Sequence, residues 1–230
     1  MRLSVVTPTC GRPEAMRLCR MWQERQTVEP HEWLIVEEFV REPGWRNYCA
    51  NLRSAVERAS GDAIVIVEDD DWYAPRYLEL VAAWLGDFDV IGNQHTRYYD
   101  LRRRSWLSVR KHISPLSQTA FRIEHRDLFL EVLSGVSHID KPYVDRDTTE
   151  TVDGGFWSAV RQRAIPFAAP MAPYRWLGIK GMPGSGQISA VRDREAHQWS
   201  RDDAGLTQLH TYLKDDAVHY LPFVAAEAVA

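Results

Sequence analysis

Short apolar runs recur along the first half of the chain at intervals typical of buried strands. They predict strands at Leu3–Val6, Trp33–Val36, Ala63–Val67 and Phe88–Ile91. The third run is apolar at every position, which is typical of a strand that is buried on both faces of a parallel sheet.

The stretches between these runs carry apolar residues three and four positions apart, which is the period of a helix. This spacing predicts helices that contain Ala15–Trp22, Arg46–Ser60 and Pro75–Leu85, with Gly61 ending the second. Strands that alternate with helices favour right-handed crossovers. We therefore expect an α/β fold, Rossmann-like, with a mostly parallel sheet flanked by helices.

The second half of the chain is less regular. It predicts one short strand and three helices: Ser117–Ile123, His125–Leu133, Phe156–Gln162 and Leu206–Lys214. The segment Trp176–Gly186 holds too much Gly and Pro for either element. Without repeats or a low-complexity linker, the chain predicts one domain over residues 1–230. We expect a ligand-binding half over about residues 1–94 and an irregular half over about 95–230.

Composition is that of a globular protein, with 45% hydrophobic residues, 26% charged residues and a formal net charge of −4 over 230 residues. The three cysteines, Cys10, Cys19 and Cys49, have no metal-ligand spacing, and their odd number favours reduced thiols. No signal sequence follows Met1, and no apolar run approaches the roughly 20 residues that span a bilayer. We expect a soluble, cytoplasmic protein without a membrane span.

Four consecutive acids, Glu68 to Asp71, directly follow the Ala63–Val67 strand. Carboxylates packed so closely repel one another and raise each other's pKa, a cost that a bound divalent cation offsets. Oxygen ligands suit Mg²⁺ or Mn²⁺, and the carboxyl end of a parallel strand is where open α/β sheets place ligands. The pattern predicts a metal site for a phosphorylated ligand; the alternative is a solvated acidic turn.

The opening strand ends in Thr7-Pro8-Thr9, with Arg12 shortly after, and this loop resembles the start of GT-A glycosyltransferases of the family-2 type. The helix with Asn47 and Asn51 and the acidic strand are similar to the central stretch of that family. The resemblance implies a nucleotide-sugar donor, UDP-linked, with contacts at these positions: Thr7, Pro8, Thr9, Arg12, Glu37, Asn47, Asn51, Glu68 and Asp69. Taken alone, the two asparagines could also cap their helix.

The Asp-x-Asp signature of the family falls on the four acids. Aligned on the following Trp72-Tyr73-Ala74-Pro75, Asp70 is expected to bind Mn²⁺ or Mg²⁺, Asp69 lies near the ribose, and Glu68 replaces the usual first Asp. The resemblance also implies a base at the start of a late helix, and Asp153 is the candidate. The alternative for Asp153 is an ordinary helix N-terminal acid.

The stretch Ile179–Gly184 is similar to small glycosyltransferases encoded by tailed phages and bacteria, which would place the protein in the host cytoplasm if it is phage-encoded. In such relatives a histidine follows as a second metal ligand, and His197 is the nearest here. Lys180 is expected to close over the donor diphosphate from this flexible segment. The alternative is an exposed loop lysine.

Cations and aromatics are interleaved between residues 97 and 112. They are Arg97, Tyr98, Tyr99, Arg102, Arg103, Arg104, Trp106, Arg110, Lys111 and His112. With the phage-like resemblance, this pattern predicts a DNA acceptor, such as a hydroxylated base. The alternatives are a solvated hairpin, and a glycan or small-molecule acceptor. The net negative charge disfavours a dedicated DNA-binding protein.

These features predict a metal-dependent glycosyltransferase that moves a sugar to a hydroxyl with inversion. Two other classes compete. A nucleotidyltransferase on a related sheet would normally have a Gly-rich, basic loop after the first strand, and residues 7–13 offer only Gly11 and Arg12. A non-catalytic binding module would not need the intact acids Asp69, Asp70 and Asp153.

Overall fold

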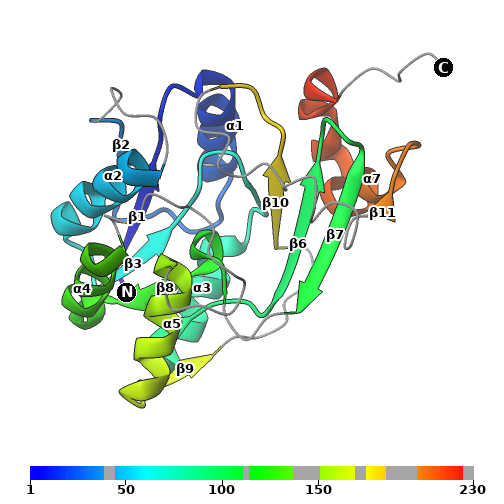
Figure 1. The fold of residues 1–230 in the computed structure, drawn as a ribbon. Coiled ribbons are helices and arrows are strands. Elements are labelled where there is room, and N and C mark those ends of the chain that lie inside the picture. The colour runs from blue at the N-terminus through cyan, green and yellow to red at the C-terminus, as the bar shows by residue number, and fades with distance from the viewer. Residues whose placement is uncertain (39–44, 111–113, 137–150, 169–174, 185–200, 225–230) are drawn as a thin grey trace.

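A computed structural model describes residues 1–38, 45–110, 114–136, 151–168, 175–184 and 201–224 (Figure 1). Its larger sheet has six strands. In spatial order they are β2 (Glu32–Val36), β1 (Leu3–Pro8), β3 (Ala63–Ile66), β8 (Ala120–Arg122), β5 (Val90–Ile91) and β9 (Phe167–Ala168). The four strands predicted in the first half are all present, with ends that differ by one or two residues.

Three of the five pairings in this sheet are parallel: β2 with β1, β1 with β3, and β5 with β9. β8, predicted only as a short strand, lies antiparallel between β3 and β5. Two 3₁₀ turns flank it, η1 (Leu116–Gln118) and η2 (Ile123–His125). The α/β fold with helices on both faces is confirmed, and the antiparallel insertion interrupts its parallel order.

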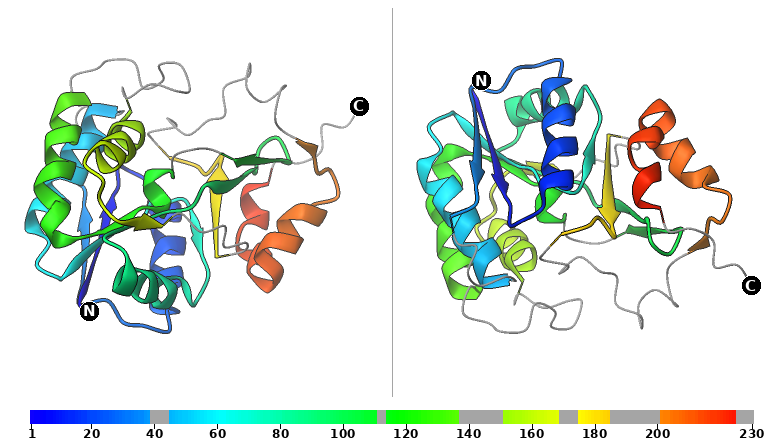
Figure 2. Two further views of the ribbon diagram at one scale, coloured as in Figure 1. Left: turned by 90° about the horizontal axis from the view of Figure 1, so that it is seen from below. Right: turned by 90° about the horizontal axis from the view of Figure 1, so that it is seen from above.

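Helices cover both faces of this sheet (Figure 2). On one face lie α2 (Trp45–Arg58), α4 (Arg126–Val136) and α5 (Val152–Gln162); on the other lie α1 (Pro13–Glu24) and α3 (Tyr77–Asp87). Ile64 and Ile66 pack with the first group, whereas Ala63 and Val65 pack with the second. Successive side chains of a strand point to opposite faces, so the continuous apolar run is explained by burial on both.

A smaller five-stranded sheet stands beside the first. Its order is β11 (Arg201–Asp202), β7 (Ser105–Arg110), β6 (His95–Asp100), β10 (Trp176–Lys180) and β4 (Trp72–Tyr73). The hairpin interpretation of residues 97–112 is therefore correct for β6 and β7, which pair antiparallel. Lys111 and His112 lie outside the described residues.

The prediction that Trp176–Gly186 forms no strand was wrong for its first five residues. β10 pairs parallel with β6 and antiparallel with β4. Gly178 is needed within the strand, because a Cβ there would lie 2.3 Å from the Tyr98 ring. Gly178 therefore marks a close approach of the β10 backbone to the Tyr98 side chain, and not a loop.

The last described segment, α7 (Thr207–Leu213) with η4 (Lys214–His219) and η5 (Leu221–Phe223), packs near α1 and β4. Asp216 accepts hydrogen bonds from Trp72 Nε1 at 2.9 Å and from Arg25 at 2.6 Å. Asp216 thereby fixes the side chain of Trp72, the residue that follows the four acids. Among the described helices, none has both the length and the apolar character that crossing a membrane requires.

Candidate active site

The loops after β1 and β3 meet at the carboxyl edge of the larger sheet. Thr9 donates from its hydroxyl to Asp69 at 2.7 Å. Arg12 donates to Asp69 at 2.9 Å and to Asp70 at 2.8 Å, with only 13% of its side chain exposed. The first loop and the acidic stretch therefore form one polar cluster, at the edge where such sheets bind ligands.

The other two acids are held by neighbours that the sequence did not reveal. Glu68 accepts a hydrogen bond from the Tyr48 hydroxyl at 3.2 Å. Asp71 accepts from the backbone N–H of Ile179 at 3.0 Å, and the ammonium of Lys180 lies 3.9 Å from the same carboxylate. Asp69, Asp70 and Asp71 are buried between α2 and β10 and Glu68 is half-buried, which excludes the solvated-turn alternative.

The charges in this cluster do not balance among the described residues. When all four carboxylates from Glu68 to Asp71 are ionised, they face two cations, Arg12 and Lys180, which leaves an excess of two negative charges. Burial raises the pKa of Glu68 to about 7 and that of Asp69 to about 6. Burial alone would also raise the pKa of Asp70, but Arg12 and Lys180 hold it below its ordinary value.

A divalent cation fits this donor set. One carboxylate oxygen from each of Glu68, Asp70 and Asp71 lies within 4.8 Å of the others. The Oδ2 atom of Asp71 is buried and has no hydrogen-bond partner among the described residues. Hard oxygen ligands that are few and close suit Mg²⁺ or Mn²⁺, and one such ion would neutralise the two excess charges.

The raised pKa values predict that the metal-free protein loses stability as pH rises from about 4.5 to about 7. The folded state binds protons at Glu68 and Asp69 that the unfolded chain has already released, so the free energy of unfolding falls with pH. Each proton contributes a slope of about 1.4 kcal/mol per pH unit. Urea unfolding in EDTA measures this slope; Glu68→Gln should reduce it and Mn²⁺ should oppose it. A free energy of unfolding that stays constant over this pH range would contradict the charge imbalance of the cluster.

Lys180 differs from its predicted setting. It is the last residue of β10 and only 7% exposed, so it is neither a flexible loop residue nor an exposed one. Its Nζ also lies 5.2 Å from the centre of the Tyr98 ring. Burial would lower the pKa of Lys180, but the acids, Asp70 foremost, raise it above its ordinary value, so this lysine is charged.

Lys180→Met should lower the free energy of unfolding by about 3–5 kcal/mol at pH 7, because it leaves buried acids without a cation. Chemical denaturation measures the loss. Lys214→Met, which removes an exposed lysine, should change the free energy by less than about 0.5 kcal/mol. Equal stability of the two variants would show that Lys180 does not compensate the acids.

The predicted donor-contacting asparagines support the loops around the cluster. Asn51 donates to the Thr9 carbonyl at 2.9 Å and accepts from the Glu38 N–H at 3.1 Å. Asn47 donates to the Cys10 sulfur at 2.9 Å, while its buried Oδ1 atom has no partner among the described residues. Neither caps the first turn of α2, and Asn51 links the loops after β1 and β2.

The remaining predicted contacts differ in exposure. Thr7 and Pro8 are buried at the end of β1, and Thr7 accepts a hydrogen bond from Trp33 Nε1. Glu37 is exposed and accepts from the Gly11 N–H. Gly184 lies against this loop, where its added Cβ would be 3.2 Å from the Arg12 Cα. The segment after β10 therefore reaches the first loop.

Asp153 lies in the first turn of α5, as the sequence predicted, and Thr151 caps that helix by accepting from the Gly154 N–H at 3.1 Å. Burial raises the pKa of both Tyr48 and Tyr98, the tyrosines beside Glu68 and Lys180, and the negative charge of Asp153 adds to this effect. The carboxylate of Asp153 therefore lies within electrostatic range of these two tyrosines. His197, the predicted second metal ligand, lies outside the described residues.

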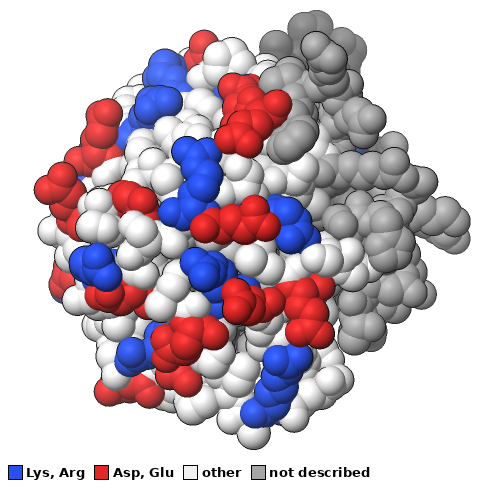
Figure 3. Space-filling model, turned by 90° about the vertical axis from the view of Figure 1, so that its left-hand side faces the viewer, with Lys and Arg blue, Asp and Glu red and all other residues white. Residues whose placement is uncertain are grey.

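The arginines of the hairpin make contacts within the protein. Arg97 stacks over the Tyr212 ring, and Arg102 donates to the Gly181 carbonyl at 3.1 Å. Arg103 lies 3.6 Å from Asp100, and Arg104 reaches the Ala204 carbonyl. Figure 3 shows the side of α2 and α4, away from the hairpin; on that face positive and negative side chains are interspersed and form no basic patch.

The sequence missed three tyrosines of the site and the part that Asp71 plays. Tyr73 accepts from the Glu68 N–H at 3.0 Å and donates to the Ser117 carbonyl at 3.0 Å. Tyr48 and Tyr98 contact the cluster from α2 and β6. No sequence spacing links these residues. Asp71 could have been found, because it directly continues the acidic run.

Comparisons with known proteins agree with this fold. The model of glycosyl transferase family 2 matches residues 26–139, which include the four acids but not Arg12, Asp153 or Lys180. A comparison with curated sequences gave no match.

Two solved structures share the fold. A mannosyltransferase from Pyrobaculum calidifontis, solved with GDP-Man and Mn²⁺, is 14% identical with a TM-score of 0.53, and the match covers 96% of this chain and 69% of that one. S. aureus TarS 1–349, solved with UDP, is 13% identical with a TM-score of 0.52, and the match covers 78% and 60%. The chain thus spans about three fifths of that TarS structure. The chain therefore has the GT-A fold of these solved structures, and the family model matches a little under half of it.

Proposed function

We propose that this protein transfers a sugar from a nucleotide-sugar, UDP-linked, to a hydroxyl acceptor with the help of Mn²⁺ or Mg²⁺. The buried cluster of Glu68, Asp70 and Asp71 carries the proposal, because its excess negative charge and close oxygens match one divalent cation. Structures of similar fold hold UDP, or GDP-Man with Mn²⁺, which supports this donor class.

The proposed reaction breaks the bond between the anomeric carbon and the diphosphate oxygen, which leaves with the electron pair. The acceptor oxygen forms the new bond to that carbon, and its proton moves to the carboxylate of Asp153. A bound divalent cation stabilises the charge on the leaving diphosphate. Arg12 and Lys180 add fixed positive charge at the same edge. A base on the opposite side from the leaving group implies inversion at the anomeric carbon.

The loops after β1 and β2 are proposed to hold the nucleoside. Thr7 and Pro8 end β1 there, Thr9 follows, and Asn51 joins the two loops through its hydrogen bonds. Asp69 is proposed to meet the ribose; Thr9 and Arg12 already orient its two oxygens. This arrangement presents the diphosphate to the acids that follow β3.

The test is release of nucleoside diphosphate from a panel of UDP- and GDP-sugars with Mn²⁺, Mg²⁺ or EDTA. We expect slow metal-dependent hydrolysis of a UDP-sugar without acceptor, and none in EDTA. Formation of a nucleotide–sugar bond from a nucleoside triphosphate and a sugar phosphate would instead identify a nucleotidyltransferase. Metal-dependent donor binding without any turnover would identify a binding module.

A further inference from the structure

The C-terminal segments α7 and η4 lie beside the smaller sheet (Figure 2), and η4 carries a buried acid, Asp216. Asp216 is 8% exposed. Its Oδ2 atom accepts a hydrogen bond from Trp72 Nε1 at 2.9 Å, and its Oδ1 atom accepts one from Arg25 at 2.6 Å. We propose that Asp216 is a positioning residue that, through Trp72, holds the acidic stretch in the geometry that binds the divalent cation. The inference rests on the proposed metal-dependent function.

The acidic stretch is fixed at both of its ends. At its start, the backbone N–H of Glu68 donates to the Tyr73 hydroxyl at 3.0 Å. At its end, Asp71 accepts from the backbone N–H of Ile179 at 3.0 Å. Trp72, the next residue, is 5% exposed and lies in β4, which pairs with β10. Because Trp72 is bonded directly to Asp71 and is closely packed, a displacement of its indole also displaces the backbone that carries the proposed metal ligands.

The carboxylate of Asp216 fixes the orientation of the Trp72 indole. A hydrogen bond to a charged acceptor is about twice as strong as one between neutral groups. Rotation of the buried indole would separate its N–H from this acceptor, which is unfavourable because a buried donor would be left unpaired. Arg25 holds the same carboxylate in an ion pair, so Asp216 cannot turn away from Trp72 without losing that contact as well. The two contacts therefore fix Asp216 and Trp72 relative to each other.

Asp216 also joins the acidic stretch to α1. Arg25 directly follows that helix, and Arg12, which directly precedes it, donates to Asp69 and Asp70. The helix is therefore tied to the acidic stretch at both of its ends, by Arg12 at the start and through Asp216 at the end. In metal sites, residues that orient the ligands without touching the metal commonly set its affinity. Asp216 has this place relative to the proposed metal ligands.

Mn²⁺ binding with saturating UDP, measured by electron paramagnetic resonance, tests the inference. Asp216→Asn keeps the shape of the side chain but offers one acceptor oxygen to two donors. We expect it to bind Mn²⁺ about tenfold more weakly, the low end of what loss of an orienting residue costs, with one site per chain retained. Trp72→Phe, which removes the indole donor, should weaken binding similarly. Adding Asp216→Asn to Trp72→Phe should then change the affinity by less than about twofold, because both changes break the same contact.

Tyr220→Phe is the matched control for a general loss of stability. Tyr220 directly follows η4, is fully buried, and accepts a hydrogen bond from Trp22 Nε1 at 2.9 Å. The variant therefore breaks a buried indole hydrogen bond between the same segment and α1, but leaves the bond at Trp72 in place. Urea unfolding should show a loss of stability in both Tyr220→Phe and Asp216→Asn, whereas Mn²⁺ affinity should fall only in Asp216→Asn.

Parental Mn²⁺ affinity in Asp216→Asn or in Trp72→Phe would overturn the inference, and so would an equal weakening in Tyr220→Phe. Fewer sites per chain at unchanged affinity would also overturn it, because that is the result of partial unfolding. Trp72→Phe decides the test if Asp216→Asn does not fold. Absence of Mn²⁺ binding in the parent protein would instead contradict the proposed function itself, on which the inference depends.

Discussion

Asp70→Asn should lower sugar transfer by about 10³-fold or more at saturating donor and Mn²⁺. Asp70 is the acid whose pKa is held low by Arg12 and Lys180, so it is the member of the cluster that carries a full negative charge. Its loss weakens metal binding, and Lewis-acid stabilisation of a leaving diphosphate contributes several kcal/mol. Steady-state assay of nucleoside diphosphate release measures the effect.

Asp62→Asn is the matched control, because it removes the same charge from an exposed acid that pairs with Arg2 just before β3. It should retain activity within about twofold, since surface changes of this kind have small effects. The fold of Asp70→Asn should survive, because Arg12 keeps its contact with Asp69. Near-parental activity of Asp70→Asn would remove this residue from the metal site.

Asp153→Asn should lower kcat by about 10²- to 10⁴-fold, which is the usual contribution of a general base. Its effect on donor affinity should be small, because the base acts on the acceptor hydroxyl only in the transition state. Titration of the donor in the presence of Mn²⁺, together with kcat, separates the two effects.

Asp127→Asn controls for the change of a helix N-terminal acid. Asp127 also lies in the first turn of a helix, α4, with 92% of its side chain exposed. Both variants lose a favourable interaction with the helix dipole, worth about 0.3–1 kcal/mol of stability, but only Asp153→Asn should lose turnover. A parental kcat for Asp153→Asn would show that the base is another residue.

Local patterns predicted much of the first half of the fold. The buried strand β3 and helices α1 and α2 follow directly from the period of their apolar residues, and the acids that end β3 indicated the site. These features depend on neighbours in sequence, so they can be recognised in the sequence without knowledge of the fold.

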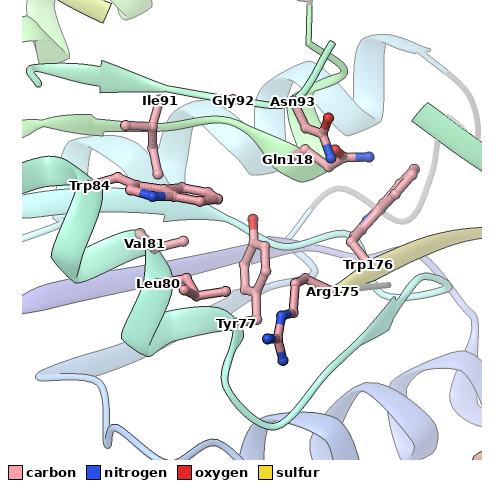
Figure 4. Close-up of a pocket in the computed structure, with 10 residues that line it drawn as sticks. All are labelled: Tyr77, Leu80, Val81, Trp84, Ile91, Gly92, Asn93, Gln118, Arg175 and Trp176. Atoms are coloured by element: carbon pink, nitrogen blue, oxygen red, sulfur yellow. The ribbon is translucent and has the colours of Figure 1, made fainter. Parts of the chain in front are cut away.

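Features that depend on distant contacts were not predicted. β10 is a strand because β6 and β4 pair with it, and Gly178 makes room for Tyr98. Lys180 is the last residue of β10, and it was expected in a flexible segment because the pairing of β10 with β6 and β4 was not predicted. The small pocket lined by Tyr77, Gln118 and Trp176 (Figure 4) joins residues that are 41 and 58 positions apart, and no motif marks it.

The most direct test of the proposed metal site is the stoichiometry of Mn²⁺ binding, measured by the loss of the free Mn²⁺ signal in electron paramagnetic resonance. With saturating UDP, we expect one tightly bound Mn²⁺ per chain in the parent protein and in Asp62→Asn. In Asp70→Asn we expect Mn²⁺ to bind at least about tenfold more weakly, because one charged ligand is lost. Equal Mn²⁺ affinity in Asp70→Asn and the parent protein would contradict the assignment of the acidic cluster as the metal site.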